Sequence, residues 1–172
     1  AGCARTNHAE RLIADLRSAD PAVRLNAAGE LRELRDPRAL GPWIAALEDE
    51  DAAVRFQAAA ALGELGDPRA AEPLIGALKD TDKDVRWAAT FALRDLGSSA
   101  VGSLIMALRD SQSAVRVSAA AALGEIQDAK AVDPLVALLE DPDPTAREMA
   151  ARALGGIGEP AAERLTPALR TG

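Results

Sequence analysis

The sequence predicts an all-α fold: an α-solenoid of about five helix-turn-helix repeats plus an N-terminal half-repeat, wound into a right-handed superhelix. Two observations predict it. A Val-Arg pair recurs along the chain, and a leucine follows each of its arginines by seven residues. The arginines are Arg24, Arg55, Arg86, Arg116 and Arg147, the last preceded by alanine instead of valine. Their spacings are 31, 31, 30 and 31 residues, and a fixed period in this range is typical of stacked repeats.

The composition favours helices over sheets. Hydrophobic residues make up 48 % of the chain but aromatic residues only 2 %, and there is no tyrosine. Alanine, leucine, valine and isoleucine therefore dominate the apolar part, which suits thin, closely packed helices. The net charge of −7 opposes binding to a phosphate backbone, so we expect no nucleic-acid partner. No apolar run approaches the roughly eighteen residues of a membrane span.

The clearest repeat begins at Asp51, which suits the N-cap of a first helix. That helix is predicted to end at Gly66, where glycine can adopt the left-handed conformation. The Asp-Pro pair that follows makes a turn. The second helix is predicted to start near Ala71, because Pro73 is tolerated only in the first turn of a helix.

The other repeats vary on this pattern. Asp20, Asp82 and Asp143 occupy the N-cap position, whereas Gln112 departs from it. Arg35 and Gln127 stand where glycine would end the first helix, so we expect less sharply capped ends there.

These features give the predicted domain organisation. A flexible leader over residues 1–7 precedes a single repeat domain over 8–172. The half-repeat covers 8–19, with a helix from Glu10 to Arg17, and the repeats cover 20–50, 51–81, 82–111, 112–142 and 143–172. The last helix carries Leu165 and Leu169 without a polar capping unit, so either the natural protein continues or this end meets a partner.

The chain begins Ala1-Gly2-Cys3, which looks like the end of a bacterial lipoprotein signal without its apolar segment. A cloning scar or a fragment boundary is the other interpretation. We expect a cytoplasmic protein, with a lipid-anchored or periplasmic one as the alternative if Cys3 follows a cleavage site.

The repeat follows the pattern Asp-x-x-Val-Arg-x-x-Ala-Ala-x-Ala-Leu-Gly-x-Leu-Gly-Asp-Pro-x-Ala-x-x-Pro-Leu-Ile-x-Ala-Leu. This pattern resembles the HEAT repeat, in the subtype named after phycobilisome lyases, from about Glu10 to Arg170. The resemblance implies that the first helices line a concave surface and that an Asp–Arg ladder joins the repeats. Members of this subtype include lyase subunits that attach bilin chromophores to phycobiliproteins, together with many interaction scaffolds.

Helical geometry predicts which residues face a partner. At about 100° per residue, the positions one, two, five and nine after each arginine lie opposite the buried valine, alanine and leucine positions. Since the first helices of adjacent repeats stack about 10 Å apart, each position forms a row. The rows are Leu25, Phe56, Trp87, Val117 and Glu148; Asn26, Gln57, Ala88, Ser118 and Met149; Gly29, Ala60, Phe91, Ala121 and Arg152; and Glu33, Glu64, Asp95, Glu125 and Gly156.

Three of the four aromatic residues fall on this predicted face: Phe56, Trp87 and Phe91. Exposed together, they would form an apolar patch of the kind that marks binding or assembly surfaces. The alternative is that the curvature of the array or packing between neighbouring helices buries the rings. The row of acids is either a rim that attracts a basic partner or a solvated position of the repeat.

The arginine column points toward the core side, and buried charge must be paired. We expect structural ion pairs with the N-cap aspartates of the same or the adjacent repeat.

No residue pattern indicates catalysis, a metal site or a cofactor. His8 is the only histidine and falls beside the leader with Cys3. We therefore predict a non-enzymatic protein–protein interaction or scaffold module that binds a partner segment, or another copy through the aromatic face or the last repeat. The alternative is a bilin lyase-like subunit that binds a linear tetrapyrrole. The predicted partner-binding residues are Leu25, Phe56, Gln57, Trp87, Phe91, Val117, Met149, Glu64, Asp95 and Glu125.

Overall fold

The computed structural model describes residues 2–162 of the chain, with side chains from residue 7 onward. Every regular element in residues 2–162 is helical, which confirms the predicted all-α class. The chain separates into two compact units, Ala1–Asp95 and Leu96–Gly172. The expected single repeat domain over 8–172 stays a prediction. The boundary falls just before the shortened turn at Gly97. Leu165 and Leu169 of the predicted last helix lie outside the described residues.

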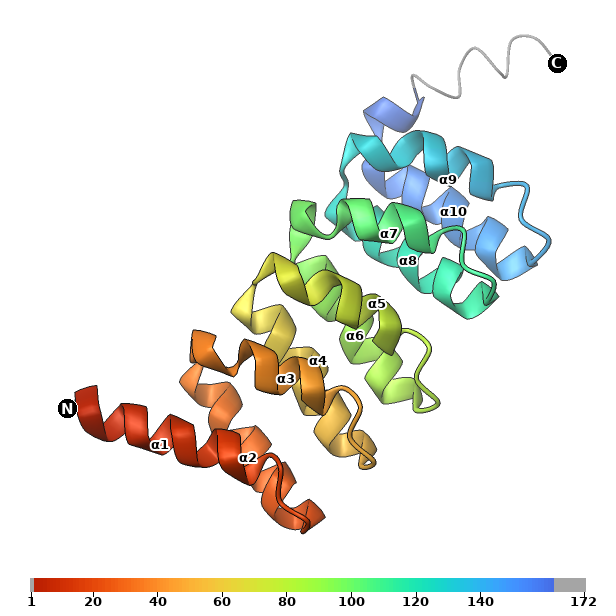
Figure 1. The fold of residues 1–172 in the computed structure, drawn as a ribbon. Coiled ribbons are helices and arrows are strands. Elements are labelled where there is room, and N and C mark those ends of the chain that lie inside the picture. Colours follow the sequence, from red (N-terminus) through yellow and green to blue (C-terminus); the bar gives the residue numbers. More distant parts are fainter. Residues whose placement is uncertain (1, 163–172) are drawn as a thin grey trace, which may run out of the picture. The chain divides into compact units, whose positions relative to one another are not determined.

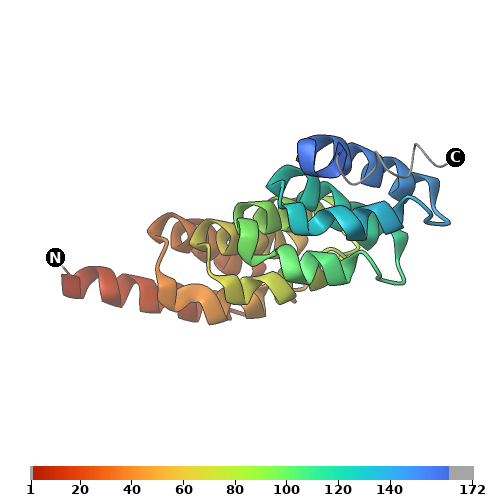
Figure 2. The ribbon, with the colours of Figure 1, turned by 90° about the horizontal axis from the view of Figure 1, so that it is seen from above.

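The first unit consists of two layers of helices (Figures 1 and 2). One layer holds α2 (Pro21–Leu34), α4 (Ala52–Leu65) and α6 (Lys83–Asp95). The other holds α1 (Gly2–Asp15), α3 (Leu40–Ala46) and α5 (Ala71–Ala77), with the 3-10 turns η1 (Pro37–Ala39) and η2 (Pro68–Ala70) leading into α3 and α5. Helix α4 packs between α2 and α6, and α1, α3 and α5 pack on α2, α4 and α6.

The second unit repeats this plan. Its longer helices are α8 (Ser113–Ile126) and α10 (Pro144–Ile157), which pack side by side. The shorter helices α7 (Val101–Ala107) and α9 (Val132–Leu138) follow the turns η3 (Gly97–Ser99) and η4 (Ala129–Ala131) and pack on α8 and α10.

The predicted N-caps are confirmed. Asp20, Asp51 and Asp143 each accept a hydrogen bond from the backbone N–H two residues later, at 2.9, 2.8 and 2.7 Å. Asp82 accepts from the N–H of Asp84 at 2.8 Å, whereas Gln112 makes no side-chain cap. Each aspartate satisfies an amide that the first helical turn leaves without a partner.

The helix ends differ from expectation at two positions. Gly66 adopts the left-handed conformation with φ 67°, as predicted. Arg35 and Gln127 also adopt it, with φ 49° and 60°. Their N–H groups bond back to the carbonyls of Arg32 and Leu123. A left-handed conformation costs a non-glycine residue about 1–2 kcal/mol. The capping hydrogen bonds, together with the packing of the helix that follows, offset this cost.

The second helix of the clearest repeat starts where the position of its proline predicted. Helix α5 begins at Ala71, and Pro73 is its third residue, within the first turn. Helix α1 begins at Gly2, eight residues before the expected start at Glu10, and it includes most of the segment expected as a leader. Residues 2–9 contain no proline and only one glycine, so nothing in them stops the helix from extending toward the N-terminus.

Alanine, leucine and valine supply most of the core, together with Trp43 on α3. The leucines seven residues after the arginines are buried: Leu31, Leu62, Leu93 and Leu123 are fully covered, and Leu154 nearly so. The first helices approach so closely that a methyl group on Gly63 of α4 would lie 2.7 Å from the Cα of Ala92 on α6. Gly124 stands in the same relation to Ala153 in the second unit. Small residues therefore set the separation between neighbouring first helices.

We expect Gly63→Ala to lower the free energy of unfolding by about 1–3 kcal/mol, because α4 and α6 must move apart. The matched control is Gly29→Ala on α2. A methyl group there would meet nothing within 4 Å, and the gain in helix propensity should stabilise by up to about 1 kcal/mol. Urea unfolding of both variants measures the difference, and equal effects would contradict the close approach.

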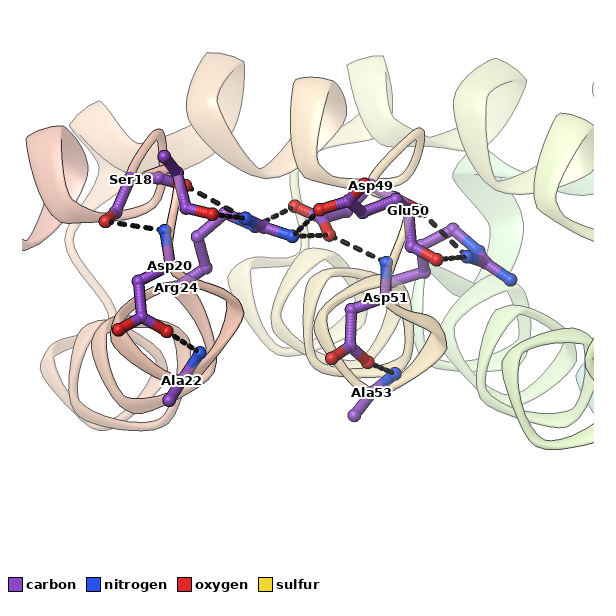
Figure 3. Close-up of polar contacts among 10 residues, drawn as sticks. Ser18, Asp20, Ala22, Arg24, Asp49, Glu50, Asp51 and Ala53 are labelled. Carbon is purple, nitrogen blue, oxygen red and sulfur yellow. Dashed lines mark hydrogen bonds and ion pairs between the residues drawn. The ribbon is translucent and has the colours of Figure 1, made fainter.

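Arginine side chains join consecutive repeats within each unit (Figure 3). Arg24 Nε and Nη2 donate to the two carboxylate oxygens of Asp49 at 2.8 and 3.0 Å, while Nη1 donates to the carbonyl of Ser18 at 2.9 Å. The Asp49 carboxylate also accepts from the N–H of Asp51 at 2.9 Å. One carboxylate thus holds the arginine of one repeat and the helix start of the next.

The same pairing recurs as Arg55 with Asp80, at 2.6 and 2.8 Å, and as Arg116 with Asp141, at 2.7 Å for both bonds. The expected N-cap partners were wrong: the acceptor is the aspartate two residues before the N-cap. The reason is that each N-cap carboxylate is already bonded to its own helix. Hydrogen bonding by Arg55 lowers the pKa of Asp80 below its ordinary value of 3.8.

We expect Asp80→Asn to lower the free energy of unfolding by about 2 kcal/mol near neutral pH, since it leaves Arg55 without its counter-ion in a largely buried site. Because the folded-state pKa of Asp80 is depressed, the stabilisation is complete well above pH 3.8. It is lost as the pH falls below that value toward the lower folded pKa. Unfolding at a series of pH values should show wild type and variant converging in acid. The exposed control Glu48→Gln should change stability by less than about 0.5 kcal/mol, and a gap that persists in acid would contradict this account.

Candidate functional site

Two aromatic rings lie against each other on the outer side of α6. Trp87 and Phe91 are four residues apart, and their ring centroids are 4.1 Å apart at an interplanar angle of 44°. Trp87 is 58 % exposed, whereas Phe91 is half-buried. Phe56 lies half-buried on α4, the helix that packs beside α6. We call Phe56, Trp87 and Phe91 the aromatic cluster.

A guanidinium group extends the aromatic cluster. The Cζ of Arg94, one turn beyond Phe91, lies 4.4 Å from the centroid of the Phe91 ring, a cation–π contact. Arg94 also donates from Nε and Nη2 to Asp95, at 3.0 and 2.8 Å. The three-residue spacing from Phe91 to Arg94 is the sequence signal that could have indicated this contact.

A polar network lies beside the cluster, between α2 and α4. Arg32 donates to Glu64 from Nε at 2.8 Å and also from Nη2, and its Nη1 donates to the amide oxygen of Gln57 at 3.0 Å. Arg35 approaches the second oxygen of Glu64 at 3.5 Å. With Gly29 and Glu33, these residues line an open pocket of about 480 Å³. The charges of this pocket are therefore largely neutralised by one another.

Comparison with known proteins defines the family. The model for HEAT repeats matches residues 9–94 and 101–172, and the PBS lyase HEAT-like repeat matches residues 85–110. The chain belongs to the HEAT-repeat family. The predicted resemblance to the phycobilisome-lyase subtype is confirmed. No curated protein matches the chain.

Three solved structures share the fold of this chain. The complex of CpcE and CpcF of phycocyanin lyase from Nostoc sp. PCC7120 is 32 % identical, with a TM-score of 0.61, over 95 % of this chain and 70 % of that chain. An engineered protein is 25 % identical with a TM-score of 0.56, over 93 % and 84 %. A structure from work on microtubule plus-end tracking by XMAP215, CLIP-170 and EB1 is 18 % identical with a TM-score of 0.76, over 92 % and 82 %, and shares the fold alone.

The predicted site residues of this HEAT-repeat chain differ in exposure and in hydrogen-bond partners. In the first unit, Trp87 is exposed and Leu25 is half-buried. Gln57, Glu64 and Asp95 are engaged by Arg32, Arg35 and Arg94, as described above. In the second unit, Val117 and Met149 are half-buried and Glu125 is exposed. Whether these residues bind a partner stays a prediction.

One detail of the predicted face was wrong. Ala88, expected on an exposed row, is only 3 % exposed, because the packing side of α6 is wider than an ideal helical wheel implies. The three aromatic rings of this face differ in exposure. Neighbouring side chains half-cover Phe56 and Phe91, which leaves Trp87 as the accessible ring of the cluster.

The titration shifts found in residues 2–162 are structural in origin. Lowered carboxyl pKa values occur at Asp36, Asp67, Asp80, Asp141 and Asp143, each stabilised as the anion by hydrogen bonds. The pKa of Asp67, for example, falls to about 2 because Arg69 donates to it. Among the described residues, no group of three or more histidine, cysteine, aspartate or glutamate side chains is placed to hold a metal ion.

Within residues 2–162 none of the helices combines the length and the apolar character needed to cross a membrane. In the second unit, an apolar pocket of about 450 Å³ lies beside α10, lined by residues that include Leu139, Leu154 and Ala161. Self-association through the last repeat remains a prediction.

Fluorescence should separate the two tryptophans. Trp43 is 1 % exposed and Trp87 is 58 % exposed. In a Trp43→Phe variant we expect red-shifted emission that acrylamide quenches readily, because the Trp87 indole meets solvent. In a Trp87→Phe variant the remaining Trp43 should emit at shorter wavelength and resist quenching. Protection of Trp87 at every protein concentration would contradict the exposed cluster, and protection only at high concentration would indicate self-association.

Proposed function

We propose that this HEAT-repeat chain is a non-enzymatic protein–protein interaction module that binds a segment of a partner protein on the exposed face of α4 and α6. The observation that carries the proposal is the exposure of Trp87. Trp43 on α3 is the tryptophan of the core, at 1 % exposed, whereas Trp87 is 58 % exposed and contributes little to that core.

The energetic argument favours Trp87 as the centre of binding. A tryptophan of this exposure leaves on the order of 100 Å² of mostly apolar surface in water. Covering that surface is worth about 2.5 kcal/mol. This is the size of effect that defines a hot-spot residue at an interface, and tryptophan is enriched among such residues.

The residues around Trp87 divide into an apolar surface and a polar border in this proposal. Phe91 packs against Trp87, and Phe56 on the neighbouring helix α4 and Leu25 on α2 would extend the apolar surface. Gln57, Glu64 and Asp95 form the polar border, since arginines already hold them in place. We treat Val117, Met149 and Glu125 as a separate candidate surface on the second unit.

A bilin lyase-like subunit is the second candidate function. It is favoured by the 32 % identity to the CpcE and CpcF complex of phycocyanin lyase. In this case the aromatic cluster would offer its rings to the conjugated tetrapyrrole, and Arg94 would offer a cation to its carboxylates. A shift in bilin absorbance on mixing, lost in Trp87→Ala, would favour this candidate over the first.

The test of the interaction module compares Trp87→Ala with Met106→Ala. Met106 lies on α7 and is 72 % exposed, so it controls for the loss of any exposed apolar side chain. We expect the wild type and Met106→Ala to capture the same partner from a lysate of the source organism. Trp87→Ala should lose at least tenfold of this binding while its unfolding free energy changes by less than about 0.5 kcal/mol.

Two results would overturn the proposal. Capture that is equal for all three proteins would show that Trp87 is not the centre of binding. Destabilisation of Trp87→Ala by more than about 2 kcal/mol would show that the ring belongs to the core.

A further inference from the structure

The aromatic cluster already binds one cation within the chain. The Arg94 guanidinium lies 4.4 Å from the centre of the Phe91 ring, within the distance at which the negative face of an aromatic ring attracts a positive charge. Trp87 contacts the same ring but is itself 58 % exposed. Indole is the strongest of the aromatic side chains in this interaction. The cluster therefore offers its best cation-binding ring to solvent.

The two arginines near Trp87 are bonded to acceptors of the chain and leave its ring exposed. Arg94 is paired with Asp95. The Nη1 of Arg86 is turned to the carbonyls of Asp80 and Thr81, at 2.8 and 2.9 Å. Both arginines are thus held by acceptors of the chain.

Two exposed side chains of opposite charge lie one turn before Trp87 on α6, so their charges largely cancel. Asp84 is three residues before the ring and Lys83 is four residues before it, and residues at these spacings share a helix face. The chain as a whole carries a net charge of −7, which raises the local concentration of basic partners and lowers that of acidic ones.

We propose that the partner segment is basic, and that one of its arginines stacks on the exposed face of Trp87 as Arg94 stacks on Phe91. This inference rests on the proposed function, because it specifies the chemistry of the segment that the aromatic cluster binds. Arginine fits better than lysine because its planar, weakly hydrated guanidinium can lie flat on a ring. An acidic segment would be repelled by the net negative charge of the chain.

The probes are short synthetic peptides that differ at one residue type. The first alternates leucine, serine and arginine. The second replaces every arginine with citrulline, which keeps the shape but is neutral, and the third replaces it with glutamate. Fluorescence anisotropy of the labelled peptides measures the dissociation constant. We expect the arginine peptide to bind about two- to fivefold more tightly than the citrulline peptide for each stacked arginine.

Three variants of the chain separate the cation–π contact from simple apolar burial. Trp87→Leu keeps an apolar side chain but has no ring, so it should lose most of the preference for arginine and keep only the part that the net charge of −7 supplies. Trp87→Phe keeps a weaker ring and should retain part of the preference for arginine. Lys83→Gln removes the nearby like charge and should strengthen binding of the arginine peptide without changing that of the citrulline peptide.

The outcomes distinguish failure of this inference from failure of the proposed function. Equal binding of the arginine and citrulline peptides, lost in Trp87→Ala, would leave the interaction module intact and overturn the basic partner. Tightest binding of the glutamate peptide, or an arginine preference that is undiminished in Trp87→Leu, would also overturn it. Binding of no peptide would contradict the inference, while the capture experiment with Trp87→Ala and Met106→Ala judges the proposed function on its own.

Discussion

The pairing of an arginine with an aspartate twenty-five residues later holds successive helix pairs together in each unit. In the Arg24–Asp49 pair, one carboxylate accepts two hydrogen bonds from the guanidinium and a third from the backbone N–H of Asp51. The arginine in turn donates to the carbonyl of Ser18 in the loop before its own helix. A single pair thus fixes the end of one repeat, the start of the next and the loop between them. Because the two side chains are largely buried, the charges lose water, and the geometry of the bonds must compensate for that loss.

This constraint works together with the small residues between the first helices. Gly63 and Ala92 allow α4 and α6 to approach until a methyl group would not fit. The arginine–aspartate pairs set the spacing at the loop end of each helix pair, and the small residues set it along the helices. With the spacing fixed in both places, the residues on the outer face of α4 and α6 have little freedom to repack, which keeps Trp87 exposed.

The outer face of the first unit is therefore a product of the packing beneath it. Arginines near the ends of the helices form ion pairs with Glu64 and Asp95. These two acids therefore form a polar border whose negative charge is largely neutralised. The aromatic cluster lies beside this border, with one ring covered by Arg94 and one ring open. The lowered carboxyl pKa values of Asp80 and Asp141 come from hydrogen bonds that hold the repeats together, and recognition of another molecule by this face stays a proposal.

The sequence by itself determined the repeat, the starts of the helices capped by aspartate and the buried leucines, since these depend on local capping and on a period that recurs along the chain. It identified Trp87 as an exposed ring for the same reason: position on a helix follows from counting residues. The tertiary structure alone decided which aspartate accepts each arginine, because the N-cap aspartates and Asp49, Asp80 and Asp141 lie only two residues apart and look alike in sequence. It also decided the burial of Ala88 and the half-burial of Phe56 and Phe91, which depend on how closely two helices approach and not on the pattern within either one.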